Sequence, residues 1–228
     1  MIDLIPGLRR YRWREKDLVL HEDHRWVLVL IADAQERGLL PKPVRVVLFD
    51  RHTDAAEPGE LTPVTDVASV YDCCANELSV HDDDWIVAGI RLGLIADVFV
   101  FGVDDRMGDL PKAVGKFGIF GRFEMPGSLG ELGVRAREVL DWTESSILLD
   151  VDLDCFAYAY RNHMKAWDEE LFEQEFGPGL EMFKMFLDRA GMITVCREAG
   201  CCGGEENADR IWELLRGKLL AEAVEVSG

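Results

Sequence analysis

Short apolar runs alternate along the chain with longer segments whose apolar residues recur at helical spacing. Four runs have the length and composition of buried strands: VRVVLF, ADVFVFGV, SILLDVDLD and MITVCRE. The segments predicted as helices are HEDHRWVLVLIADAQERG, VTDVASVYDCC, DDDWIVAGIRLGLI, ELGVRAREVLDW, DEELFEQEFGPGLEMFKMFLDRAG and ENADRIWELLRGKLLAEA. The stretch KFGIFGRFEM predicts a hairpin or an edge strand. This order predicts an α/β fold, a three-layer α/β/α domain with a mainly parallel sheet, over residues 1–228.

The charge of the chain restricts its partners. The formal net charge is −18 over 228 residues, which argues against a nucleic-acid partner because phosphate would be repelled. The same charge suits a cationic ligand, although an acidic surface also serves solubility alone. The longest apolar run, WVLVLIA, is too short to span a bilayer, and no targeting segment is visible. We therefore expect a cytoplasmic protein without a membrane partner.

The cysteine pattern does not indicate a thiolate zinc site. None of the six cysteines forms a C-x-x-C pair, and four of them lie in two adjacent pairs. We expect reduced thiols that pack as small apolar side chains.

Three of the four predicted strands end in ionisable residues that suit a binding site, and the remaining strand ends in Asp104 and Asp105 without the period-two spacing. The first ends in Asp50, His52 and Asp54, the third in Asp150, Asp152 and Asp154, and the fourth in Glu198. Residues two apart in an extended chain point the same way, and the carboxyl ends of parallel strands meet at one edge of a sheet. We therefore expect these side chains to gather at that edge.

A cation would relieve the repulsion among so many carboxylates. Oxygen-rich sites with one or two imidazoles suit manganese or iron(II). His24, at the start of the first predicted helix, is a further candidate ligand. Taken singly, each triplet is also consistent with a solvated loop or an acidic turn, and the histidine with a surface residue. The shared spacing after two apolar strands favours the metal site.

These motifs resemble those of the arginase and agmatinase superfamily. DRHTD is similar to its D-A-H-x-D motif, and LLDVDLD is similar to its S-x-D-x-D-x-x-D-P segment. With Asp23-His24 and the D-W-I sequence at Asp84, the order of motifs resembles a divergent arginase-like branch that includes the peptide arginases. The resemblance covers residues 21–198, and its two aspartate motifs are specific.

The resemblance implies an arginase-like fold and a pair of manganese ions, preferred over Fe²⁺ or Zn²⁺. Carried over by position, the metal ligands would be His24, Asp50, His52, Asp54, Asp150 and Asp152. Asp50 and Asp150 are candidates to bridge the ions. Glu198 would grip the guanidinium group of the substrate, and Asp154 would hold the bridging hydroxide or orient a ligand. His81 is a loose candidate for the general acid/base.

The sequence also departs from the superfamily's pattern. Leu148 replaces the serine of the third motif, and Cys155-Phe156 replaces its Asp-Pro ending. Asp154 falls one residue early. The loop that would bind the α-carboxylate and α-amine of a free amino acid has no counterpart, which favours arginine carried on a peptide.

The expected activity is hydrolysis of a guanidino group, which converts peptide-borne arginine to ornithine and releases urea. Other guanidino compounds remain alternative substrates. A metal-dependent deacetylase-like amide hydrolase is a second interpretation of the same metal site, and a metal-binding module without catalysis is a third. For Glu198, a surface ion pair or a capping role near Gly203 is the alternative.

Overall fold

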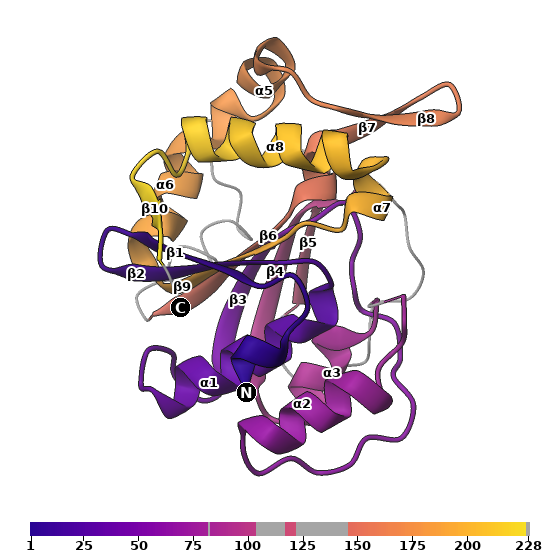
Figure 1. The fold of residues 1–228 in the computed structure, drawn as a ribbon, viewed down its shortest axis with the longest axis vertical. Helices are drawn as coiled ribbons and strands as arrows, with labels where there is room; N and C mark the ends of the chain where they lie inside the picture. Colours follow the sequence, from indigo (N-terminus) through magenta and orange to yellow (C-terminus); the bar gives the residue numbers. More distant parts are fainter. Residues whose placement is uncertain (82, 104–116, 122–145, 227–228) are drawn as a thin grey trace.

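A mixed sheet of eight strands forms the centre of the part of the chain that the structure describes (Figure 1). The computed structural model describes residues 1–81, 83–103, 117–121 and 146–226. The strand order is β10-β1-β2-β9-β6-β3-β4-β5. The six strands from β2 to β5 are parallel, β1 pairs antiparallel with β2, and β10 pairs antiparallel with β1. Their bounds are β1 Arg9–Trp13, β2 Lys16–His21, β3 Val44–Phe49, β4 Ile95–Val103, β5 Phe117–Gly121, β6 Ile147–Asp152, β9 Ala190–Cys196 and β10 Ala223–Glu225.

Helices cover both faces of this sheet. The bounds of the α-helices are α1 Val27–Glu36, α2 Val67–Asn76, α3 Trp85–Arg91, α5 Glu169–Glu175, α6 Leu180–Arg189, α7 Ala199–Cys202 and α8 Glu205–Lys218. Short 3-10 helices are η1 Ile2–Leu4, η2 His24–Trp26, η4 Leu153–Phe156 and η5 Gly177–Gly179. In Figure 1, α1, α2 and α3 lie on one side of the sheet, and α5, α6 and α8 lie on the other.

Alternate residues of β3 belong to different hydrophobic cores. Val46 and Leu48 pack with the residues of α1, α2 and α3. Val47 and Phe49 pack with the apolar residues of α5, α6 and α8. A strand segment buried on both faces has to be apolar, which explains the unbroken VVLF run of Val46–Phe49; the partly exposed Arg45 before it pairs with Asp97. The prediction of an α/β fold with a mainly parallel sheet between two helical layers is confirmed.

Most of the predicted helices and strands are present near their predicted positions. The first helix ends before Gly38, whose φ of +71° suits a residue that stops a helix. The KFGIFGRFEM stretch contains β5, which is an edge strand and pairs only with β4 among the described strands. The predicted helix ELGVRAREVLDW and the ionisable pair after β4, Asp104 and Asp105, lie outside the described residues.

Two hairpins were not predicted. In β1, Tyr11 and Trp13 are buried and alternate with arginines, and β2 follows after a tight turn. The other hairpin pairs β7, Ala157–Tyr160, with β8, His163–Ala166. The first hairpin is important for the site. Its strand β2 runs parallel to β9, so the HEDH segment at the end of β2 lies at the edge where the carboxylates gather.

The six cysteines are free, and the packing role expected for them fits the buried ones but not Cys201. Cys201 is exposed and the other five are buried. None of the helices in the described ranges is both long enough and apolar enough to cross a bilayer.

Candidate metal centre

Four adjacent parallel strands bring their carboxyl ends together at one edge of the sheet. These strands are β2, β9, β6 and β3, in that order. His21 at the end of β2 is the register partner of Cys196 in β9, and Cys196 is the register partner of Asp152 in β6. The ionisable residues predicted to gather at this edge therefore do so.

His24 lies buried at the centre of this edge and faces carboxylates on both sides of its ring. Its Nε2 lies 2.8 Å from Oδ2 of Asp150. Its Nδ1 lies 2.8 Å from Oδ2 of Asp54, 3.3 Å from Oδ2 of Asp152 and 3.5 Å from Oδ2 of Asp50. A carboxylate that accepts the proton of Nε2 leaves the lone pair of Nδ1 to bind a cation.

Asp150 is an anchor for this histidine. Its Oδ1 accepts a hydrogen bond from Oγ1 of Thr194 at 2.7 Å, and its Oδ2 contacts Nε2 of His24 at 2.8 Å. Three groups of described residues bring ligand atoms within 4.8 Å of one another, and Asp150 belongs to none of them. The groups are His24 with Asp50 and Asp54, Asp50 with His52 and Asp154, and His24 with Asp152, Cys196 and Glu198.

Asp50 belongs to two of these groups and so connects them. Its Oδ1 lies 3.7 Å from Nδ1 of His52 and accepts a hydrogen bond from the backbone N–H of His52 at 2.6 Å. Nδ1 of His52 also lies 3.1 Å from Oδ2 of Asp154. A carboxylate between two such groups has the position of a ligand that bridges two cations.

Burial removes these carboxylates from water and so disfavours their charged form. Burial, followed by the charges of Asp54, Asp152 and Asp154, raises the pKa of Asp50 well above its usual value. Burial and the charge of Asp154 raise the pKa of Asp152 to about 7. Without cations, this cluster therefore retains protons that exposed aspartates would lose.

The two histidines respond to the same charges. Burial opposes a charge on His24, but the carboxylates of Asp150 and Asp54 outweigh it and raise its pKa well above the usual value. A hydrogen bond to Asp154 raises the pKa of His52 to about 9. Protons on these rings partly neutralise the cluster, which is the role that divalent cations would take.

The donor atoms fit divalent cations. Oδ2 of Asp50 and Oδ1 of Asp154 are buried, and neither accepts a hydrogen bond within the described part of the chain. A buried hydrogen-bond acceptor without a donor lowers the stability of the folded protein. Carboxylate oxygens with two imidazole nitrogens form a set that suits Mn²⁺ or Fe²⁺.

Two residues of the site have left-handed backbone conformations. The φ angle is +47° at Asp54 and +27° at Glu198. Such angles are uncommon for residues other than glycine, and cost about 1–3 kcal/mol. Asp54 is further fixed by a 2.7 Å hydrogen bond from Nε1 of the buried Trp85, which explains the D-W-I sequence beside the site.

A cavity of about 240 Å³ opens beside the metal-ligand candidates. Its lining residues are His52, Thr53, Asp54, Ala55, Ala56, His81, Asp83, Glu198 and Cys201. His81 is exposed and Glu198 is 12% exposed. Two of the three predicted catalytic residues, His81 and Glu198, therefore line this cavity, and the third, Asp154, does not.

Sequence reasoning missed Cys196 and Thr194 near the site, and it named the D-W-I motif without giving Trp85 a role. Cys196 was treated as a packing residue, but it belongs to a group with metal-ligand spacing. Thr194 and Trp85 hold Asp150 and Asp54. The only sequence signal for Thr194 was a polar residue in an otherwise apolar strand. His21 is buried, and burial lowers its pKa to about 4, so it is a neutral neighbour of the site.

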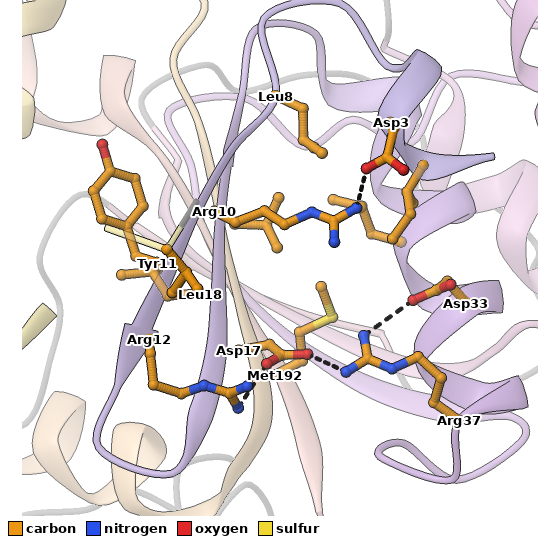
Figure 2. Close-up of a pocket in the computed structure, with 14 residues that line it drawn as sticks. Asp3, Leu8, Arg10, Tyr11, Arg12, Asp17, Leu18, Asp33, Arg37 and Met192 are labelled. Atoms are coloured by element: carbon orange, nitrogen blue, oxygen red, sulfur yellow. Dashed lines mark hydrogen bonds and ion pairs between the residues drawn. The ribbon is translucent and has the colours of Figure 1, made fainter. Parts of the chain in front are cut away.

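A larger cavity, of about 400 Å³, lies near the opposite ends of the strands (Figure 2). It is lined by Asp17 near the start of β2 and Met192 near the start of β9. Asp17 pairs with Arg12 at 2.7 Å and with Arg37 at 2.6 Å. These ion pairs neutralise the charges of its wall, and the cavity lacks the carboxylate and imidazole cluster of the metal-centre edge.

No protein-family model matches the chain, and no curated protein matches it. The geometry of the site and the sequence motifs are therefore the basis for inferring the function.

The metal-free protein is expected to lose stability as the pH rises from 6.5 to 9. The pKa of His52 is raised from 6.5 to about 9 in the folded state, so its stabilising charge is complete below 6.5 and is lost as the pH rises through 9. Asp152 acts in the same direction up to about pH 7. Because His52 is one-third exposed, we expect a loss of about 1–2 kcal/mol in the free energy of unfolding.

Urea denaturation of the metal-free protein at several pH values measures this loss. It should shrink in His52→Gln, because that side chain does not titrate. An unfolding free energy that stays constant or increases over this range would contradict the arrangement of charges described here.

Proposed function

We propose that the chain is a hydrolase of guanidino groups with a binuclear centre of divalent cations, Mn²⁺ being preferred. The observation that carries the proposal is the position of Asp50. It belongs both to the group with His24 and Asp54 and to the group with His52 and Asp154. Two imidazoles placed on either side of a shared carboxylate favour two cations over one.

The geometry favours a ligand set shifted by two residues in the third motif. In this set, Asp152 and Asp154 are ligands, and Asp150 orients His24 through its Nε2 atom. The remaining ligands are His24, Asp50, His52 and Asp54. The resemblance aligned Asp150 with a metal ligand, whereas in the shifted set Asp150 is a positioning residue for His24.

Paired divalent cations lower the pKa of a coordinated water toward neutrality and so supply a nucleophile. The residues of the chain provide the rest of the chemistry. The carboxylate of Glu198 pairs with the guanidinium of the substrate and orients its carbon toward the centre. His81, at the mouth of the cavity, donates a proton to the leaving amine.

The substrate proposed is arginine within a peptide, which would be converted to ornithine with release of urea. The chain has 43 acidic and 25 basic residues, so its field attracts a basic peptide. The absence of an amino-acid clamp from the sequence pattern supports a peptide over free arginine. The proposed compartment is the cytoplasm, consistent with six free thiols.

Metal analysis followed by product analysis tests this function. The protein is loaded with Mn²⁺ and incubated with an arginine-containing peptide, with the lysine analogue of that peptide and with free arginine. Urea from the arginine peptide alone, with a mass loss of one CN₂H₂ unit from that peptide, supports the proposal. No urea from any guanidino compound refutes it, and acetate from an acetylated peptide would support the deacetylase interpretation.

The shifted ligand set makes Asp150→Asn and Asp154→Asn differ. Asp154→Asn removes a charged ligand, so we expect one of the two cations to be lost. Asp150→Asn keeps an acceptor for Nε2 of His24, so both cations should remain bound, with affinity about 10–100-fold weaker. Elemental analysis after dialysis measures the stoichiometry. A loss of one cation from Asp150→Asn, with two retained by Asp154→Asn, would restore the unshifted assignment.

A further inference from the structure

The third group of potential ligands differs from the other two because it contains a thiol. Asp152 and Cys196 are register partners on the neighbouring parallel strands β6 and β9. Side chains of such partners project on the same side of a sheet. Both residues stand at the carboxyl ends of their strands and are buried, so the thiol lies at the floor of the site.

The donor atoms of these four side chains lie close to one another. Nδ1 of His24 lies 3.3 Å from Oδ2 of Asp152 and 3.7 Å from Oε1 of Glu198. Sγ of Cys196 lies 3.6 Å from the same Glu198 oxygen. All four donor atoms lie within 4.8 Å of one another. The set comprises one sulfur, one nitrogen and two oxygen atoms from four side chains.

We propose that His24, Asp152, Cys196 and Glu198 form a binding site for a thiophilic divalent cation, and Zn²⁺ is the ion that we expect to bind there. Zinc takes four ligands in a tetrahedron and accepts sulfur, nitrogen and oxygen donors, whereas Mn²⁺ prefers oxygen. When the ion binds, the Cys196 thiol gives its proton to solvent as the sulfur–metal bond forms. The two other groups contain no sulfur, so the thiol gives this site a different preference.

The site has a consequence for the proposed hydrolase, and that consequence rests on the proposed function. His24 and Asp152 are also proposed manganese ligands, so zinc competes with one of the two manganese ions. Glu198 is the proposed guanidinium contact, so bound zinc removes the group that orients the substrate. Zinc is therefore expected to inhibit the manganese enzyme by occupying its centre. Binding of zinc itself does not depend on the hydrolase function.

Cobalt spectroscopy tests the site without an activity measurement. Co²⁺ replaces Zn²⁺ in tetrahedral sites, and a cobalt–thiolate bond gives a charge-transfer band in the near ultraviolet. The metal-free protein and Cys201→Ser should both develop the band on titration with Co²⁺, and Cys196→Ser should not. Cys201 is the matched control because its exposed thiol lines the adjacent cavity beside Glu198.

A competition measurement provides the second readout. Cys196→Ser should weaken Zn²⁺ binding at least about 10-fold relative to Mn²⁺ binding, as measured by competition with a chromogenic chelator. Circular dichroism establishes that the variant is folded, and Cys196→Ala replaces it if the buried serine hydroxyl prevents folding. A charge-transfer band that survives in the folded variant, or an unchanged ratio of zinc to manganese affinity, would overturn the proposal. Neither readout uses urea release, so both stand if the hydrolase proposal fails.

Discussion

His52→Ala and Asp152→Ala, made separately, are each expected to lower manganese content and urea release together, by roughly 100-fold or more in activity. His52 follows β3 and Asp152 is the last residue of β6, and each belongs to a group with metal-ligand spacing. A joint loss from either substitution requires one shared site. Elemental analysis after dialysis and a urea assay with an arginine peptide give the two measurements.

The control for these variants is His163→Ala. His163 is an exposed histidine in β8, outside the groups with metal-ligand spacing, so its replacement should leave metal content and activity unchanged. Circular dichroism separates loss of the site from loss of the fold. If both folded variants retained the metal content of the parent protein, the binuclear centre would be wrong.

Glu198→Gln is expected to retain manganese and lose turnover of an arginine peptide by roughly 30- to 1,000-fold. The substitution keeps the size of the side chain and removes the charge that pairs with a guanidinium. The φ angle of +27° at Glu198 supports a functional role, because an uncommon backbone conformation aims its side chain at the cavity. Steady-state kinetics with the manganese-loaded protein measure the loss.

Glu206→Gln is the matched control, since Glu206 is an exposed glutamate in the first turn of α8. This variant should have the kinetics of the parent. Turnover by Glu198→Gln equal to that of the parent would refute the guanidinium contact. The metal centre would still stand, because the proposed manganese ligands do not include Glu198.

The sequence was sufficient to predict the sheet interior and the edge that carries the site. A strand buried on both faces must be apolar along its length, so the runs before Asp50 and Asp150 could be recognised without a partner. Polar residues that follow such runs have to emerge at the carboxyl edge. The gathering of the two aspartate triplets followed from this physical requirement.

Spacing could not decide which aspartates of the third motif reach a cation. Asp150, Asp152 and Asp154 are each two residues apart, so an extended chain points all three the same way. Depth along the strand distinguishes them. Asp150 lies far enough inside β6 to meet Thr194 of β9, while Asp154 lies beyond the strand in η4 and meets His52. Only the tertiary pairing of β6 with β9 supplies that information.

The same limitation concealed Cys196 and the first hairpin. A cysteine in an apolar strand is usually interpreted as a packing residue. Cys196 is a candidate metal ligand only because Asp152 is its register partner. The hairpin of β1 and β2 alternates arginines with Tyr11 and Trp13, a pattern that is too short to identify without the strand it joins.

The position of β9 sets the order in which this chain can assemble. β9 lies between β2 and β6 in the sheet, although more than 160 residues of sequence separate it from β2. During synthesis, β2 and the HEDH segment therefore have no strand on the β9 side until β9 itself has been made. Contacts of such long sequence separation form late and slowly. Cations that require both His24 and Asp152 can therefore bind only after β9 has been synthesised and has joined the two strands.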